Sequence, residues 1–418
     1  MVVSQIERST DLPVAGHRAG EDLLARRNGN EPLKIVHIIS DLVVGGAEMN
    51  LYRLLSGIDL ARYQTTVVTL RDGGELRERI KALGVEVYSL GMRPPAPSPG
   101  SLVRLIRLMR RLDPDLIQGW MYYGNLAAQF AAPLLSRRPV TVWGVRQSIY
   151  SLTREKPMTA LAIWLSARLS KRPAAIIYNS TKGAVQHESI GYEGGKSRII
   201  YNGFDLEAFA PSQKARLSVR AELGLPPDAM VIGLIGRYHP AKDHANFLSA
   251  AAILAKDHPE IHFVLSGRGV HRENRTLGAV MKPLGFNGNV HLLGERKDVA
   301  RLMASFDISV SSSAREGFPN VVGEAMACGV PCVVTDVGDS AKLVGSTGLI
   351  VPPRNPEALA QAWRELVAMG ASSRTQLGHA ARERIRDNFQ LPSIIGQYEE
   401  LFTSVLQKRR KHLHLCDS

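Results

Sequence analysis

The stretch EGFPNVVGEAMACGVPCVVTDV, residues 316–337, contains the most informative pattern in the chain. It predicts a tight turn, a helix that begins at Asn320, and a buried strand over residues 331–336. Glu316 lies on the loop before this helix, and Glu324 lies about one turn inside it. The helix N-terminus between the two carboxylates offers unpaired N–H groups and a partial positive charge. This combination suits a ligand with hydroxyl and phosphate groups, although a surface glutamate beside an ordinary helix would give the same pattern.

Short apolar runs alternate with amphipathic stretches from Leu33 onward, and this alternation occurs twice. The runs before a polar, proline-bearing passage at 210–228 are 34–40, 65–70, 85–90, 116–120, 140–145, 174–180 and 198–203. The runs after it are 230–236, 261–267, 290–294, 307–313, 331–336 and 348–353. Strands that alternate with helices predict a parallel sheet covered on both faces. The expected fold class is therefore α/β, with two Rossmann-like doubly wound domains facing a cleft, and ligands are expected beyond the carboxyl ends of the strands.

The length of 418 residues exceeds what one ordinary hydrophobic core uses, which predicts two domains. We expect a flexible leader at 1–31, a first domain at 32–208 and a second domain at 209–390. Residues 391–418 are expected to form a helix that packs back toward the first domain and ends near residue 409 in a basic tail. The leader lacks an apolar signal core. No window of about 18 apolar residues occurs, so no membrane-spanning helix is expected.

The net charge of +13 and the pI near 9.8 favour acidic partners. The chain has no nucleic-acid-binding signature, so we expect no nucleic-acid partner and favour anionic lipid or phosphorylated ligands. Cys328 and Cys332 lack cysteine or histidine neighbours at metal-ligand spacing, and both are expected to be small buried hydrophobes. This cysteine usage is typical of a reducing compartment, which predicts a cytoplasmic protein without a metal site at these thiols.

The segment GRYHPAKDH, residues 236–244, follows directly after a predicted strand. Gly236 lets the backbone turn, and the loop after it lets Arg237 and Lys242 converge on one anion. An arginine fork and a lysine charge suit a diphosphate, and they would offset negative charge on a departing diphosphate. Two solvated basic residues would also explain the pattern. Earlier in the chain, a glycine pair that includes Gly46 opens a predicted helix and could expose amides to phosphate, or form a plain turn.

Five segments occur in a recognisable order: GGAE (45–48), IYNGFD (200–205), GRYHPAKDH, EGFPNVVGEAMACGVP and TDVG (335–338). Together they resemble glycosyltransferase family 4, retaining enzymes with the GT-B fold, over about residues 33–405. EGFPN and the RQS at 146–148 look like the bacterial subgroup that builds surface polysaccharides such as lipopolysaccharide or exopolysaccharide. The resemblance implies transfer of a hexose from a UDP- or GDP-sugar to a lipid-linked or saccharide acceptor. It also implies front-face chemistry with retention, no cofactor and no required metal.

The resemblance implies roles for individual residues. Glu316 would bind hydroxyls of the donor sugar, while Arg237 and Lys242 would hold its diphosphate; these three are the expected catalytic residues. Glu324 would accept hydrogen bonds from the ribose, and the base would lie near Gly294. The full set of implied donor-binding residues is Gly46, Asn202, Gly236, Gly294, Gly317, Phe318, Pro319, Asn320 and Glu324.

One segment departs from the family pattern. Relatives often carry histidines after the strand that ends near Trp120, whereas this chain has QGWMYYGN at 118–125. We therefore name Tyr123, Asn125 and Arg146 as acceptor-side candidates. The departure also leaves a catalytically weakened nucleotide-sugar-binding protein as one alternative. A nucleotide-sugar epimerase of the same fold is the other.

Two basic amphipathic stretches, 101–114 and 161–172, could lie on an anionic membrane or pack on their own sheet. Because acceptors of this subgroup are often lipid-linked, we expect peripheral attachment to the cytoplasmic face of the inner membrane. Asp113-Pro114-Asp115 matches an Asp-x-Asp metal motif in form. Its place at a predicted helix-to-strand turn favours turn chemistry instead.

Overall fold

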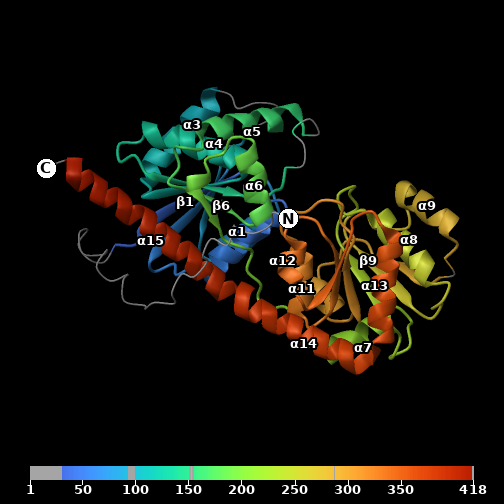
Figure 1. Ribbon diagram of the computed structural model, residues 1–418. Coiled ribbons are helices and arrows are strands. Elements are labelled where there is room, and N and C mark those ends of the chain that lie inside the picture. Colours follow the sequence, from blue (N-terminus) through green and yellow to red (C-terminus); the bar gives the residue numbers. More distant parts are fainter. Residues whose placement is uncertain (1–30, 93–98, 150–151, 153–154, 287, 417–418) are drawn as a thin grey trace, which may run out of the picture.

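The computed structural model describes residues 31–92, 99–149, 152, 155–286 and 288–416, with the side chains of 99 and 410–416 excepted. The expected leader falls almost wholly in residues 1–30, outside the described part. Two α/β domains lie next to each other, and a long C-terminal helix runs from the second domain along the first (Figure 1).

The first domain contains a parallel sheet with seven strands among the described residues, in the order β3-β2-β1-β4-β5-β6-β7. Its strands are β1 (Leu33–Ile39), β2 (Tyr63–Thr69), β3 (Glu86–Ser89), β4 (Leu116–Trp120), β5 (Val140–Val145), β6 (Ala175–Tyr178) and β7 (Ser197–Ile199). Its helices are α1 (Gly46–Gly57), α2 (Leu76–Lys81), α3 (Pro99–Leu112), α4 (Met121–Ala131), α5 (Pro157–Leu169) and α6 (Thr181–Ser189). The strand order reverses between β1 and β4, so a ligand crevice is expected beyond their carboxyl ends.

The second domain repeats this design, with six described strands in the order β10-β9-β8-β11-β12-β13. Its strands are β8 (Val231–Ile235), β9 (His262–Ser266), β10 (Val290–Leu292), β11 (Ile308–Ser311), β12 (Cys332–Thr335) and β13 (Gly348–Val351). Its helices are α7 (Gln213–Glu222), α8 (His244–Leu254), α9 (Arg275–Met281), α10 (Val299–Met303), α11 (Asn320–Ala327), α12 (Ser340–Val344) and α13 (Pro356–Ala368). The predicted two-domain α/β fold is confirmed. Cys328 and Cys332 are buried free thiols, as predicted.

Helices α14 (Gly370–Phe389) and α15 (Leu391–Cys416) end the chain. Ile394, Tyr398 and Phe402 of α15 are buried in the core of the first domain, together with side chains of α1 and β1. The expected helix end near residue 409 is wrong, because α15 continues to Cys416. The KRRKHLH segment contains neither glycine nor proline, and lysine and arginine are good helix formers.

Side chains at the domain boundary join the two domains. Asp339, which precedes α12, accepts hydrogen bonds from Ser180 Oγ at 2.9 Å, from the Thr181 amide at 2.6 Å and from the Lys182 amide at 3.0 Å. A carboxylate of the second domain therefore caps α6 of the first domain, where it also meets the positive end of the helix dipole. Lys182 pairs with Asp336 at 2.9 Å beside this cap.

The two candidate membrane helices are part of the first domain. Leu105 and Met109 of α3 are buried against α4, whereas Arg104, Arg107, Arg110 and Arg111 are exposed. α3 thus packs on its own sheet with a basic outer face. Within the described residues, no helix is long and apolar enough to cross a membrane.

Candidate functional site

Two of the three predicted catalytic residues, Lys242 and Glu316, lie on neighbouring loops at the carboxyl edge of the second sheet. Lys242 Nζ lies 2.5 Å from Glu316 Oε1, and Ser313 Oγ donates a hydrogen bond to the same oxygen at 2.8 Å. Two further hydrogen bonds join the loops: Ser312 Oγ donates to the Lys242 carbonyl at 2.9 Å, and the Ala314 amide donates to the Ala241 carbonyl at 2.8 Å. Lys242 and Glu316 are therefore held in contact before any ligand binds.

Arg237 is exposed on the same loop, and its charge acts on the first domain. Burial raises the pKa of Glu48 in α1, and the nearby Arg237 guanidinium partly opposes this shift. Arg237 thus lies toward the N-terminal turn of α1, where Gly46 and the GGAE segment are located. No role was predicted for Glu48 from the sequence, although its place in the GGAE segment was the available signal.

Glu324 lies inside α11, as predicted, and it already has a partner. Its Oε1 accepts a short hydrogen bond from Arg53 of α1, and both residues are buried. This ion pair joins the two domains. Arg53 was not predicted from the sequence. Its signal there is a cation among the buried leucines of an amphipathic helix, Leu51, Leu54 and Leu55.

A chain of polar contacts connects three of the predicted positions across the cleft, and a fourth, Gly46, lies beside it. Arg146 donates to Asn202 Oδ1 at 2.9 Å, and Asn202 Nδ2 donates to Asn320 Oδ1 at 2.7 Å. A Cβ on Gly46 would lie 3.9 Å from Asn320 Nδ2, so the N-terminus of α1 faces the N-terminus of α11. A Cβ on Gly317 would lie 3.6 Å from the Arg146 carbonyl. These loops meet where the strand ends of the two sheets face each other.

Arg146 follows β5, and its side chain is partly buried at the cleft, with Nε enclosed. The guanidinium lies over the rings of Trp120 at 5.2 Å and Tyr398 at 5.7 Å. Burial lowers the pKa of Arg146 to about 9. Among the described residues no carboxylate lies within ion-pair distance of it, which is costly for a buried charge unless a ligand supplies the anion.

The segment at 118–125, which lacks the histidines common in relatives, is largely buried. Gln118 and Trp120 are fully buried, and Trp120 Nε1 donates to His37 Nδ1 at 3.2 Å. Burial lowers the pKa of His37 to about 3, so this imidazole is neutral near pH 7. Met121, at the junction of β4 and α4, has a φ of 61°, which is uncommon for a residue other than glycine.

The two acceptor-side candidates on α4, Tyr123 and Asn125, differ in their exposure to solvent. Tyr123 is 39% exposed, and its hydroxyl lies 3.3 Å from Thr159 Oγ1 of α5. Asn125 is fully buried, and its side-chain amide exchanges hydrogen bonds of 3.2 Å and 3.1 Å with the backbone of Gly144. Both ends of the Asn125 amide hold β5 in this conformation, so the predicted acceptor contact has no support from the position of this side chain.

Several predicted donor-binding positions can offer only their backbone. Phe318 is buried and stacks on Tyr201 at 5.2 Å, so its side chain belongs to the core. Gly236 and Pro319 flank the two loops described above, and Gly236 lies against the Lys242 stem. The Gly294 carbonyl already accepts from the Gly267 amide at 2.7 Å and from a serine hydroxyl of β9.

The cavities at the cleft are small in this conformation. The cavity beside Lys242 and the one beside Arg146 each have a volume of about 10 Å³. Small-molecule sites usually measure about 300 Å³ or more. Neither of these two cavities has room for a nucleotide in the arrangement seen here.

Comparison with known proteins adds independent findings. A family model described as Glycosyltransferase Family 4 matches residues 44–208, and one described as Glycosyl transferases group 1 matches residues 229–369. The putative glycosyltransferase EpsF of Bacillus subtilis (strain 168) is 27% identical over 85% of this chain and 91% of its own length.

Two further relatives match about half of the chain. The UDP-Gal:alpha-D-GlcNAc-diphosphoundecaprenol alpha-1,3-galactosyltransferase of Escherichia coli is 27% identical over 58% of this chain and 63% of its own length. The lipopolysaccharide core biosynthesis glycosyltransferase LpsE of Rhizobium meliloti (strain 1021) is 32% identical over 44% of this chain and 53% of its own length.

Among solved structures, Anabaena HepE in complex with UDP-glucose aligns with a TM-score of 0.78 at 23% identity, covering 89% of this chain and 100% of that one. WaaG, a glycosyltransferase involved in lipopolysaccharide biosynthesis, aligns with a TM-score of 0.67 at 17% identity, covering 88% and 99%. At these identities the structural likeness establishes the fold alone.

Proposed function

Because the chain belongs to glycosyltransferase family 4, we propose that it transfers a hexose from a UDP- or GDP-sugar, with retention and without a metal ion, to a lipid-linked or saccharide acceptor in surface polysaccharide biosynthesis. The contact between Lys242 and Glu316 carries this proposal, because it puts a phosphate-binding cation beside a sugar-binding carboxylate. The relatives named above are glycosyltransferases, which favours transfer over the epimerase alternative.

In the proposed reaction the donor diphosphate lies between the loop of Lys242 and the N-terminus of α11. The bond from the anomeric carbon to the diphosphate oxygen breaks, and Lys242 and Arg237 stabilise the charge that develops on that oxygen. The acceptor hydroxyl attacks from the same face and gives its proton to the departing phosphate. Glu316 orients the sugar through its hydroxyls, and no protein side chain forms a bond to it.

The comparisons favour particular substrates within this class. Three solved HepE complexes contain UDP or UDP-glucose, and the Escherichia coli relative is named for a UDP-sugar and a diphosphoundecaprenol acceptor. We therefore favour UDP as the nucleotide and a lipid-linked acceptor. Tyr123 and Arg146 remain the acceptor-side candidates, and the buried Arg146 cation suits an anionic group on the acceptor.

Peripheral attachment to the cytoplasmic face of the inner membrane belongs to the same proposal. The exposed arginines of α3 and the exposed Leu161 and Trp164 of α5 would face the lipid. Sedimentation with anionic vesicles at low salt tests this attachment, and a protein that stays in the supernatant would exclude it.

A donor screen tests the transfer activity. Nucleotide release is measured from a panel of UDP- and GDP-sugars, with and without EDTA, for the wild type, for Glu316→Ala and for Glu357→Ala on α13 as a matched control. We expect release from at least one donor, unchanged by EDTA and by the control, and a loss of about 100-fold or more in Glu316→Ala. Donor binding without release would instead indicate a weakened binding protein, and an epimerised donor without release an epimerase.

A further inference from the structure

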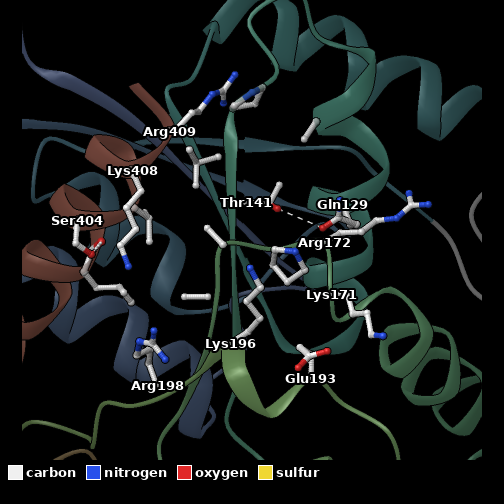
Figure 2. A pocket seen from close by; sticks show the side chains of 18 of the residues that line it. Gln129, Thr141, Lys171, Arg172, Glu193, Lys196, Arg198, Ser404, Lys408 and Arg409 are labelled. Atoms are coloured by element: carbon white, nitrogen blue, oxygen red, sulfur yellow. Dashed lines mark hydrogen bonds between the residues drawn. The ribbon is translucent and has the colours of Figure 1, made fainter. Parts of the chain in front are cut away.

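A large cavity lies at the edge of the first sheet opposite the cleft (Figure 2). Its volume is about 1040 Å³. Val140 and Ala175, which begin β5 and β6, line it, and Leu401 and Val405 of α15 form an apolar wall. The strands therefore start at this cavity, whereas the loops of the cleft follow their carboxyl ends. The two sites are separated by the length of the sheet.

The lining of this cavity, which we call the basic pocket, is strongly cationic. One acidic residue, Glu193, accompanies seven basic residues, an excess of six positive charges: Arg138, Lys171, Arg172, Lys196, Arg198, Lys408 and Arg409. Among the described side chains, no carboxylate lies within ion-pair distance of any of the seven. Glu193 in the lining and Asp115, whose charge acts on Arg409, therefore offset only part of the positive charge of the pocket.

Helix dipoles explain only part of this charge. Lys171 and Arg172 follow the C-terminus of α5, where cations are favourable. Lys196 and Arg198 lie at the start of β7 instead, and Lys408 lies within α15. These cations come from segments far apart in the chain and gather in one concavity, where like charges repel until an anion binds.

The basic side chains that line the pocket point in different directions. Lys196 and Lys408 extend their ammonium groups into the pocket from opposite sides, and Arg198 lies below Lys408 (Figure 2). Lys171 and Arg172 point their charged ends away from the middle of the pocket. Two inward ammonium groups from different elements can bind two anionic groups of one ligand at the same time.

We propose that the basic pocket is a second ligand site, which binds an oligoanion with two or more phosphate groups, either free in solution or as the headgroup of an anionic lipid. Its volume is at the upper end of the usual range for small-molecule sites. A ligand held by Lys196 and Lys408 links the start of β7 to α15, the helix that connects the second domain to the first. The site is independent of the proposed transfer reaction, because it shares no residue with the cleft.

Calorimetric titration with inorganic tripolyphosphate at low salt tests the proposal. The inward pair is altered in Lys196→Gln/Lys408→Gln, and the outward pair in Lys171→Gln/Arg172→Gln, so both variants lose two charges. Lys242→Gln reports any binding at the cleft. We expect saturable binding to the wild type, a loss of affinity of at least about 10-fold in the first variant, and a change of less than about threefold in the second variant and in Lys242→Gln.

Vesicles distinguish the two sources of the phosphate groups. If sedimentation with vesicles that contain cardiolipin, a lipid with two phosphate groups, but not with phosphatidylcholine vesicles, falls in Lys196→Gln/Lys408→Gln and not in the outward pair, the ligand is a lipid headgroup. If only tripolyphosphate binding falls, it is a free oligoanion. The proposal is overturned if neither probe binds saturably, if both pairs lose affinity equally, or if the Lys242→Gln variant accounts for the binding. Thermal unfolding of each variant confirms that it is folded.

Discussion

At the scale of single residues, the cleft contains charges that are paired and charges that have no ion-pair partner among the described residues. Lys242 is neutralised by Glu316, and Glu324 by Arg53. Within the described part of the chain, Arg146 contacts the amide oxygen of Asn202 and the faces of two aromatic rings. A cation in this setting destabilises the fold unless it serves a ligand, so its presence is better explained by binding than by stability.

Replacement of Arg146 by glutamine should therefore separate stability from activity. We expect the free energy of unfolding to stay the same or rise, because a desolvated charge is removed, and turnover with acceptor to fall by about 10-fold or more. Urea unfolding and initial rates with varied acceptor measure the two effects, with Arg146→Lys as the variant that keeps the charge. Unchanged turnover in Arg146→Gln would remove this residue from the site.

Replacement of Asn125 by alanine should lower stability without affecting acceptor binding, which is the opposite of the result expected for Arg146→Gln. The change leaves the N–H and carbonyl of Gly144 buried without their partners, which should cost about 2–4 kcal/mol of unfolding free energy. Because the side chain lies in the core, we expect the KM for the acceptor to stay within about twofold of the wild type at a temperature where the variant is folded. A raised KM without lost stability would restore Asn125 as an acceptor contact.

At the scale of elements, the strands were predictable because buried parallel strands are continuous apolar runs, and each predicted run overlaps a strand of the structure. The loops that carry Lys242 and Glu316 were predictable, because the motif of each loop lies within a few residues of a strand end. The Arg53–Glu324 pair could not be predicted, because its partners are 271 residues apart and no local pattern joins them. The burial of Asn125 could not be predicted for a related reason, because a polar residue early in a helix gives no sign of the strand on which it packs.

The cap of α6 by Asp339 offers a test at this scale. Asp339→Ala removes the acceptor for three hydrogen bonds at a buried helix N-terminus, and we expect a loss of about 1–2 kcal/mol of unfolding free energy. The matched control is Asp336→Ala, whose pair with Lys182 is half exposed and should contribute less than about 1 kcal/mol. Equal losses in the two variants, measured by urea unfolding, would contradict the capping role.

At the scale of the whole molecule, buried neutral histidines occur in both domains. Burial lowers the pKa of His37 to about 3, and the pKa values of His187 and His244 to about 4, from the ordinary value of 6.5. At pH values between these lowered pKa values and 6.5, the three histidines bind protons in the unfolded chain but not in the folded chain. Stability should therefore decrease as the pH falls from about 6.5 toward 4.

The slope of this decrease is measurable. Each histidine contributes up to about 1.4 kcal/mol per pH unit, so the three together should make unfolding markedly easier at pH 5 than at pH 7. Urea midpoints at several pH values measure the effect, and the exposed residues His258 and His271 serve as control sites for substitution to glutamine. A midpoint that stays constant from pH 7 to pH 5 would show that these imidazoles are not buried in solution.

Because Glu324 already pairs with Arg53, nucleotide binding requires Glu324 to exchange the guanidinium for the ribose. A ribose hydroxyl is neutral and cannot replace a guanidinium charge, so Glu324 has to leave Arg53 before it can bind the ribose. Because this pair joins the two domains, we expect the nucleotide to bind during a transient separation of the domains, when Glu324 is released from Arg53. At high nucleotide concentration the observed association rate should level off at the frequency of this opening, rather than rise without limit as it would for a preformed site.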